Sequence, residues 1–355
     1  MIHEHATREA WKRFGDPRTI TGIEEASAHV STNDVYRVSL DDATAVFVKF
    51  SSYGSYFLFY EDHDRLHRCN ELLRGTRYEH LMADVLTKDG APFTFYDGEM
   101  WAIFYQEASA DGRNLPRILS DHDVDNFADE IAAFHLTCSQ IAPQIPPTSS
   151  SVKSDIVKLF DQVSDPHRGY ERFLDKAGRA TVRRHAHEFL TQLIELGYDD
   201  FQRIPILIDW NLGNFSVVTR TDPGGGDGFE LFRRWDYDWF RIDTRMLDFY
   251  FLSRVSSQTG DRTVFTYSSH TLTEPRFRRF LHAYHRRFPL THREVLFLKE
   301  AYRFFILNYV VSSGERFFRA DLWPRLVKEA VNVYLPALDH LDLRPLADEL
   351  MVSNL

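Results

Sequence analysis

A glycine-rich turn lies inside an otherwise helical region of the chain and limits how this region can fold. Residues 222–228 read Asp-Pro-Gly-Gly-Gly-Asp-Gly, a composition typical of tight turns. Apolar, β-branched and aromatic runs flank this turn at 215–219 and 229–235, which predicts a β hairpin. In an antiparallel hairpin the residue before the first strand and the residue after the second lie at the same end. Those two residues are Asn214 and Asp236.

The hairpin end carries side chains suited to metal and proton chemistry. Carboxylate and amide oxygens are hard ligands for Mg²⁺ that is also held by phosphate oxygens, so Asn214 and Asp236 are the predicted magnesium ligands. Asp209 follows the apolar run 204–208 and lies five positions before Asn214. A carboxylate in this loop can accept the proton of an attacking hydroxyl and orient it. Each residue alone is more often a turn or cap residue, and the ordered set of three favours catalysis.

The rest of the chain changes character once. Strand signals dominate from about residue 22 to 106, with one helix predicted at 59–73, and helices dominate from residue 120 onward. The predicted strands are 35–38, 45–50, 93–96 and 101–105, and the predicted helices after residue 120 include 182–196, 294–312 and 324–341. We therefore expect an α+β protein with an N-terminal lobe at 1–107 and a helical C-terminal lobe at 108–355.

Net charge and apolar patterning exclude several classes of partner. The formal net charge is −10, so neither nucleic acid nor an anionic membrane is an expected partner. No stretch approaches eighteen uninterrupted apolar residues, so no membrane span is expected, and the charged N-terminus predicts no signal peptide. Cys69 and Cys138 lack metal or redox spacing and fit a reducing compartment. These features predict a cytoplasmic protein.

The order Asp209, Asn214, Asp236 resembles the catalytic loop and metal-binding segment of the aminoglycoside phosphotransferase and choline kinase-like family. That family, which has the protein-kinase-like fold, carries His-Gly-Asp, four residues and Asn, then a hairpin and an Asp after an apolar strand. Residues 243–249 resemble the stretch that follows, with Asp248 in the family's structural position. The helix around residues 128–135 resembles a family helix that ends in histidine, and the resemblance runs from about Gly22 to Leu252.

This resemblance implies a bilobal kinase-like fold with a nucleotide in the small β-rich lobe. Lys49 stands where the family has its phosphate-binding lysine, and residues 31–38 resemble the nucleotide-covering loop. Glu71 is the expected partner of Lys49, with Glu61 on the same predicted helix as its competitor. The cofactor-binding residues implied are Lys49, Glu71, Ser31, Asn33, Gln106 and Glu107.

His63 and His67 share helical spacing, but no zinc-enzyme pattern accompanies them, so an exposed pair is expected.

The predicted activity is transfer of the γ-phosphoryl group of ATP, with Mg²⁺, to a hydroxyl of a small polar molecule. A sugar, amino sugar, aminoglycoside or amino alcohol fits the scaffold, and the sequence does not choose among them, between ATP and GTP, or among oligomeric states. We expect the acceptor to lie against the helical lobe, with specificity set after Asp238. Candidate acceptor contacts there are Arg303, Asn308, Glu315 and Arg316.

Two departures from the family pattern support an alternative function. Leu207 and Ile208 stand where the family has His and Gly, and residues 29–38 contain no glycine. A catalytically silent nucleotide-binding or scaffold protein on the same fold accounts for both departures. A glycosidase that uses Asp209 and Asp236 as paired carboxylates explains neither Asn214 nor Lys49.

Overall fold

Two compact units make up the chain. The computed structural model describes residues 3–27, 33–52, 54–108, 111–165, 170, 174–221, 227–261 and 267–352. The first unit comprises residues 1–111 with 233–235 and 316–318, and the second comprises residues 112–232, 236–315 and 319–355. Among the described helices, none combines the length and the apolar character needed to cross a membrane.

A five-stranded antiparallel sheet forms the body of the first unit. Its strands pair in the order β1-β2-β3-β7-β6. Short turns join β2 to β3 and β6 to β7, each between β-branched and aromatic runs. The bounds are β1 (Ile20–Glu25), β2 (Asp34–Leu40), β3 (Ala45–Ser51), β6 (Thr94–Tyr96) and β7 (Trp101–Gln106). Both predicted strand pairs of this region are confirmed. A separate short ribbon pairs β4 (Thr87–Lys88) with β5 (Ala91–Pro92).

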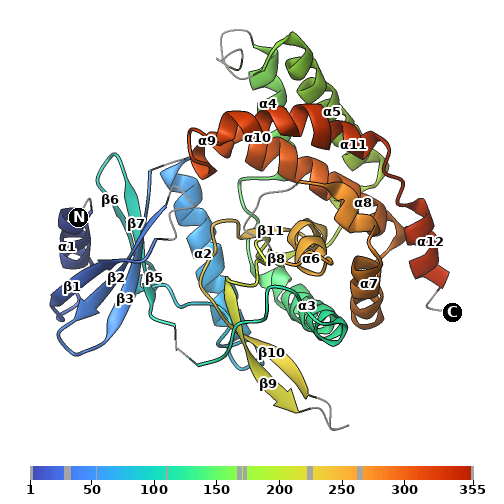
Figure 1. Cartoon of the computed structure of the whole chain (residues 1–355). Coiled ribbons are helices and arrows are strands. Elements are labelled where there is room, and N and C mark those ends of the chain that lie inside the picture. The colour runs from blue at the N-terminus through green and yellow to red at the C-terminus, as the bar shows by residue number, and fades with distance from the viewer. Residues whose placement is uncertain are drawn as a thin grey trace. The chain divides into compact units, whose positions relative to one another are not determined.

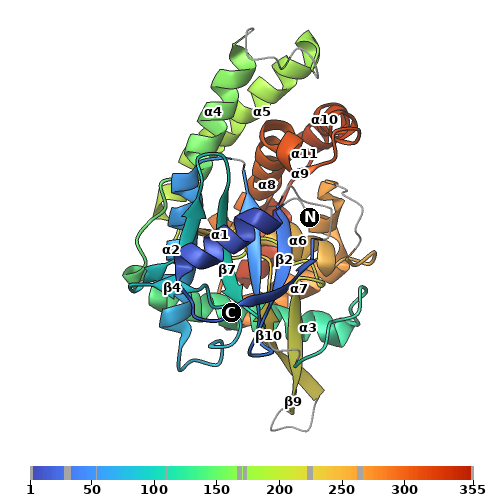
Figure 2. The same ribbon diagram turned by 90° about the vertical axis from the view of Figure 1, so that its left-hand side faces the viewer.

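Two helices lie on opposite sides of this sheet (Figures 1 and 2). Helix α1 (Glu4–Phe14) packs Trp11 into a core that includes Val48 and Phe50 of β3. Successive strand residues point to opposite faces, so Lys49, between Val48 and Phe50, points away from α1. Helix α2 (Tyr56–Leu73) covers that other side and begins three residues earlier than predicted.

Helices dominate the second unit, as predicted. The longest, α3 (Asp121–Ile141), starts with a capping box in which Ser120 accepts from the Asp123 amide and Asp123 accepts from the Ser120 amide. The others are α4 (Val152–Ser164), α5 (Lys176–Glu195), α6 (Phe249–Val255), α7 (Pro275–Arg287), α8 (His292–Phe305), α9 (Gly314–Phe317), α10 (Trp323–Glu329), α11 (Leu335–Asp339) and α12 (Arg344–Val352). Helices α4 and α5 pack side by side as a hairpin (Figures 1 and 2).

Two long predicted helices contain π-helical stretches. Helix α8 continues as a π-helix over Ile306–Ser312, and a second π-helix, Ala330–Tyr334, separates α10 from α11. The periodicity of 294–312 and 324–341 correctly predicts helix but not this local widening, in which backbone hydrogen bonds span five residues instead of four. Such stretches are common where a helix re-aims side chains at a functional site.

Two small strand pairs accompany these helices: β8 and β11 lie among them, whereas β9 and β10 project away from them (Figure 1). Strand β8 (Arg203–Ile206) pairs antiparallel with β11 (Arg241–Thr244), with Ile206 opposite Arg241. Strand β9 (Phe215–Thr221) pairs with β10 (Asp227–Arg234). The short connection between β9 and β10 requires an antiparallel hairpin, because a parallel crossover needs a dozen or more residues.

Candidate active site

Two loops connect the same two strand pairs. Residues 207–214 run from the end of β8 to the start of β9, and residues 235–240 run from the end of β10 to the start of β11. Because β8 pairs with β11 and β9 pairs with β10, the loops leave one ladder together and enter the other together. The first loop carries Asp209 and Asn214, and the second carries Asp236. This strand pairing therefore places the two loops that carry the three predicted residues next to each other at both of their ends.

The Asp248 carboxylate holds the first loop in place through hydrogen bonds to the residues on either side of Asp209. Its carboxylate accepts hydrogen bonds from the backbone N–H of Ile208 at 2.7 Å and from the indole N–H of Trp210 at 2.8 Å. The Nε2 atom of His135 donates to the same carboxylate at 2.8 Å, and its Nδ1 accepts from the Tyr284 hydroxyl at 2.8 Å. His135, Trp210 and Asp248 are fully buried, so Asp209 is held on both sides by a rigid polar network.

Ile208 adopts a backbone conformation that favours glycine. Its φ is +57°, in the left-handed region where a β-branched side chain is rarely found. The kinase family that the sequence resembles carries Gly at this position, and the structure shows why the departure is tolerated. The Ile208 side chain is buried, and its N–H is fixed by Asp248, so packing and hydrogen bonding offset the backbone strain.

Backbone contacts orient the oxygen-bearing side chains of the two loops. The Oδ1 atom of Asp209 accepts from the backbone N–H of Asn211 at 3.2 Å. The amide nitrogen of Asn214 donates to the carbonyl of Asp209 at 3.4 Å, so its amide oxygen is the atom that a hard cation would bind. In the second loop, Oδ1 of Asp236 accepts from the backbone N–H of Asp238 at 3.0 Å. This donor set of carboxylate and amide oxygens fits Mg²⁺.

A buried arginine near Asp209 was not predicted. Arg254 lies on α6 and is 8% exposed. Burial opposes its charge, yet its pKa is raised because Tyr250, other buried tyrosines and the carboxylate of Asp209 favour the charged form. Its guanidinium also lies over the Tyr250 ring, 5.5 Å from the ring centre. No motif marks this position, so only the packing of α6 beside the loop reveals it.

In the first unit, Lys49 lies on the central strand of the sheet, and its charge affects the pKa of a histidine on α2. It pairs with Val35 on β2 and Ile103 on β7. Burial, and then the charge of Lys49, lower the pKa of His63 on α2 to about 3. His63 bonds the Tyr105 hydroxyl and the Phe59 carbonyl, each at 2.6 Å. The expected exposed histidine pair is wrong for His63, which is buried because it packs between α2 and the sheet.

Glu71 and Glu107 have arginine partners. Glu71 pairs with Arg74 at 2.6 Å and lies eight residues beyond His63, about 12 Å along the helix. Glu107 pairs with Arg37 of β2 at 2.6 Å. Their roles toward a nucleotide stay predictions.

The remaining nucleotide-site candidates occupy different positions in the first unit. Asn33 is buried just before β2, and Gln106 is exposed at the end of β7. Ser31 lies outside the described residues. The proposed nucleotide contacts of these residues also stay predictions.

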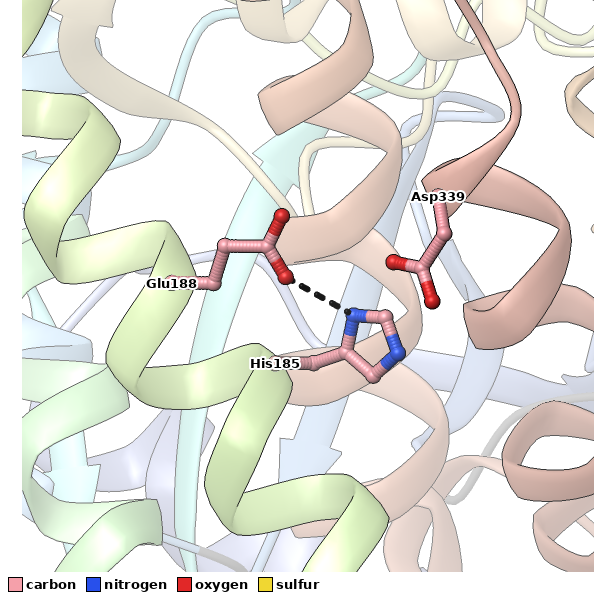
Figure 3. Close-up of side chains that lie close together, drawn as sticks. All are labelled: His185, Glu188 and Asp339. Carbon is pink, nitrogen blue, oxygen red and sulfur yellow. Dashed lines mark ion pairs between the residues drawn. The ribbon is translucent and has the colours of Figure 1, made fainter.

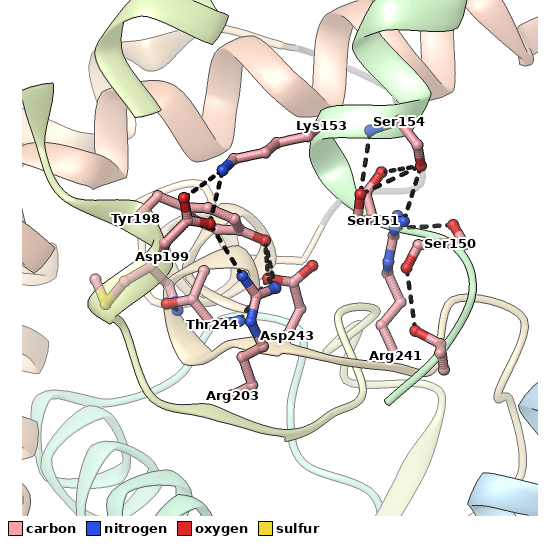
Figure 4. Close-up of polar contacts among 12 residues, drawn as sticks. Ser150, Ser151, Lys153, Ser154, Tyr198, Asp199, Arg203, Arg241, Asp243 and Thr244 are labelled. Carbon is pink, nitrogen blue, oxygen red and sulfur yellow. Dashed lines mark hydrogen bonds and ion pairs between the residues drawn. The ribbon is translucent and has the colours of Figure 1, made fainter. Parts of the chain in front are cut away.

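A polar network supports the β8–β11 pair on which both loops rest (Figure 4). Buried Arg241 donates to Asp155 at 2.9 Å and to Ser150 at 3.0 Å, which ties β11 to the start of α4. The Tyr198 hydroxyl donates to Asp243 at 2.5 Å. These contacts fix the ladder from which Asp209 and Asp236 emerge, and they give this network a structural role.

A second cluster contains residues that could bind a metal ion, but its carboxylates form ion pairs with arginines. His185 and Glu188 of α5 face Asp339 of α11 (Figure 3), with ligand atoms within 4.8 Å of one another. Arg184 pairs with Asp339 at 2.7 Å, and Arg303 pairs with Glu188 at 3.0 Å. The arginines already neutralise both carboxylates, so we assign the cluster to the packing of α5 against α8 and α11. Arg303, one of the predicted acceptor contacts, is fully buried in this network.

No protein-family model matches the sequence, and no curated protein matches it. Solved structures do match over nearly the whole chain. An amicoumacin kinase in complex with AMP-PNP, Ca²⁺ and Ami has a TM-score of 0.57 at 15% identity, covering 97% of this chain and 98% of that one. A microcompartment-associated aminopropanol kinase gives 0.57 at 15% identity, covering 98% of each chain. A choline kinase from Cryptosporidium parvum gives 0.55 at 12% identity, covering 99% of each. The chain therefore has the fold shared by the aminoglycoside phosphotransferase and choline kinase-like proteins.

Proposed function

We propose that this protein is a small-molecule kinase that transfers the γ-phosphoryl group of ATP to an alcohol. One observation carries the proposal: on a fold shared with small-molecule kinases, the two loops with Asp209, Asn214 and Asp236 connect the same pair of strand ladders. A scaffold protein has no chemical need for this set.

Each residue has a role that follows from its chemistry. Asp209 accepts the hydroxyl proton of the acceptor and orients its oxygen toward the phosphorus atom. Asn214 and Asp236 would hold Mg²⁺ through one amide and one carboxylate oxygen. When bound, Mg²⁺ neutralises charge on the phosphate oxygens. In the first unit, Lys49 is the proposed contact to the nucleotide phosphates.

The nucleotide and acceptor classes rest on what similar proteins bind. The amicoumacin kinase structure contains AMP-PNP and Ca²⁺, and an aminoglycoside phosphotransferase structure with a TM-score of 0.53 contains GDP and kanamycin. We propose a purine nucleotide with Mg²⁺, ATP first and GTP as the alternative. The proposed acceptor is a small hydroxyl compound such as an amino sugar or amino alcohol.

The test is a nucleotide-turnover assay. The purified protein is incubated with Mg·ATP or Mg·GTP and a panel of sugars, amino sugars, aminoglycosides and amino alcohols, and phosphorylated products are detected by mass spectrometry. Acceptor-dependent formation of a product 80 Da heavier, the mass of one added HPO₃ group, is expected for at least one class. The matched control is Asp209→Asn, which preserves size and removes the proton acceptor.

A catalytically silent nucleotide-binding protein is the second candidate. Leu207 and Ile208 at the family's His and Gly positions favour it. Calorimetry distinguishes the two candidates. Binding of Mg·ATP without phosphorylation of any acceptor in the panel supports the silent protein, whereas binding with turnover supports the kinase.

A further inference from the structure

The first catalytic loop has a second anchor at its far end. The backbone N–H of Leu212 donates to the Oδ2 atom of Asp261 at 2.8 Å. Asp248 fixes residues 208 and 210, on either side of Asp209. The Asp261 bond instead falls within the turn that ends at Asn214, where the N–H of Asn214 donates to the carbonyl of Asn211 at 2.9 Å. The two carboxylates therefore hold different parts of the loop.

The segment that carries Asp261 is itself tied down at three points. The backbone N–H of Asp261 donates to the carbonyl of Arg117 at 2.7 Å. The N–H of Gly260 donates to the carbonyl of Ser257 at 3.1 Å, and the N–H of Gln258 donates to Glu274 at 2.9 Å. Each bond fixes a backbone atom of the turn 257–261, so this turn presents the Asp261 carboxylate to Leu212 from a rigid base.

Gly260 shows how closely this turn is packed. Its φ is +65°, and a Cβ atom added there would lie 2.2 Å from the carbonyl oxygen of Arg117. Backbone cannot yield as a flexible side chain can, so any larger residue must displace the turn. Both the hydrogen bonds and the sterics therefore specify one position for Asp261 relative to the segment around Arg117.

We propose that Asp261 is a positioning residue that orders the metal-binding end of the loop, while Asp248 orders the end that carries the base. The proposal rests on the proposed kinase function, because it assigns Asn214 to Mg²⁺. In this role Asp261 acts through the Leu212 N–H and is assigned neither to the metal nor to the acceptor. Its loss lets the turn 211–214 sample other conformations, so Asn214 is correctly placed for a smaller fraction of the time.

Two substitutions of Asp261 distinguish a positioning role from an effect of its negative charge. Asp261→Ala removes the acceptor atom for Leu212, and Asp261→Asn keeps an oxygen acceptor while removing the negative charge. We expect Asp261→Ala to raise the Mg²⁺ concentration for half-maximal turnover about tenfold, because a hydrogen bond to a charged group is lost. Asp261→Asn should stay within about threefold of the wild type. If Asp261→Asn behaves like Asp261→Ala, charge rather than positioning is responsible and the proposal is overturned.

Hydrogen exchange gives a readout that does not depend on activity. In Asp261→Ala the Leu212 amide should exchange at least about tenfold faster, while the Ile208 amide, held by Asp248, should keep its protection. Unchanged Leu212 exchange would overturn the proposal. So would a loss of protection at both amides, which would show general unfolding.

Glycine variants supply a matched control. Gly260→Ala should displace the turn and reproduce the Mg²⁺ effect although the carboxylate is intact. Gly75→Ala has a similar positive φ of +75° but no atom within 4 Å of the added Cβ, so it should leave the Mg²⁺ dependence unchanged. A wild type without turnover on any acceptor would refute the proposed function. A wild type with turnover whose Mg²⁺ dependence matches that of Asp261→Ala would refute only the positioning role.

Discussion

The carboxylate of Asp248 lies 2.7 Å from the backbone nitrogen of Ile208 and accepts its hydrogen bond. This contact joins the residue before the proposed base to a buried acid 40 positions later. Ile208 holds a positive φ and follows Leu207, which is fully buried. The loop is therefore shaped by hydrogen bonds to Asp248, the residue just before α6, and by apolar packing. It lacks the His-Gly pair of the kinase family that the sequence resembles.

We expect Ile208→Gly to destabilise the protein, although glycine suits the observed φ. Relief of the left-handed strain is worth about 1–2 kcal/mol, whereas removing a buried Ile side chain costs about 2–5 kcal/mol. The side-chain loss outweighs the relief, so the free energy of unfolding should fall by roughly 1–3 kcal/mol. Denaturant titration measures it. A variant more stable than the wild type would show that strain dominates at this position.

Asp209→Asn should lower turnover by about 10²–10⁴-fold, because the amide cannot accept the hydroxyl proton. The affinity for Mg·ATP should change little, since Asp209 is assigned to the acceptor side. Steady-state rates and calorimetry on the same preparation measure the two quantities. Near-normal turnover would remove Asp209 from the role of base, and lost nucleotide binding would place it among the metal ligands.

Asp236→Ala should abolish Mg²⁺-dependent nucleotide binding, because it removes the carboxylate ligand from the second loop. Asp238→Ala is the neighbouring control. The backbone N–H of Asp238 donates to the Asp236 carboxylate. Alanine at position 238 keeps that N–H, so nucleotide affinity should be largely retained. Calorimetry with and without Mg²⁺ tests both variants. If they lose affinity equally, the metal site is shared between the two carboxylates.

The sequence was sufficient for the hairpin and for the order of the candidate site residues, because both depend on local patterns. The turn at 222–228 and the flanking apolar runs are read directly, and Asp209, Asn214 and Asp236 follow from their spacing. Local patterns do not reveal the anchors: Asp248 was singled out only through the family resemblance, and Asp261 was not found at all. The bond between Leu212 and Asp261 spans 49 residues, and a polar residue on a short turn has no local signal for such a partner.

Local sequence patterns also fail to predict the details of helix interiors. Periodicity predicts residues 294–312 as one helix, but the widening at 306–312 depends on packing against other segments. Arg303 likewise looks from the sequence like a surface residue available to an acceptor. The structure instead buries it between Glu300, at 2.7 Å, and Glu188, a pairing that requires α5 and α8 to be in contact.

His185 should make the protein less stable below neutral pH. Burial first, and then the charges of Arg303 and Arg184, lower its pKa to about 4, against about 6.5 in an unfolded chain. The unfolded state therefore binds a proton that the folded state excludes, and stability falls as the pH drops from about 6.5 toward 4. At pH 4.5 the loss due to His185 is roughly 2 kcal/mol.

The measurement compares denaturant titrations at pH 7.5 and pH 4.5. In His185→Asn the loss on acidification should be smaller by roughly 2 kcal/mol. His187→Asn, an exposed position on the same helix, should keep the wild-type pH dependence. Equal acidification losses in His185→Asn and the wild type would show that His185 titrates normally in the folded state.

We predict that an aromatic pair close in sequence to Asp236 contacts the acceptor. Trp239 lies three residues after Asp236 and stacks on Tyr309, with ring centres 4.5 Å apart and planes 15° from parallel. Tyr309 belongs to the π-helical stretch Ile306–Ser312, and Trp239 is partly exposed. An indole face held by stacking can bind a sugar ring or a cationic amine.

Trp239→Ala should therefore raise the Michaelis constant for the acceptor about tenfold while leaving that for ATP within about twofold, because stacking or cation–π contacts contribute roughly 0.5–2 kcal/mol. Trp239→Phe should retain part of the affinity, since it keeps a ring face. Tyr96→Ala, which removes an exposed and stacked ring of the first unit, is the matched control and should leave the acceptor constant unchanged. The comparison needs an acceptor found by the turnover assay. If Trp239→Ala raises only the Michaelis constant for ATP, the aromatic pair belongs to the nucleotide side and acceptor specificity is set elsewhere in the helical unit.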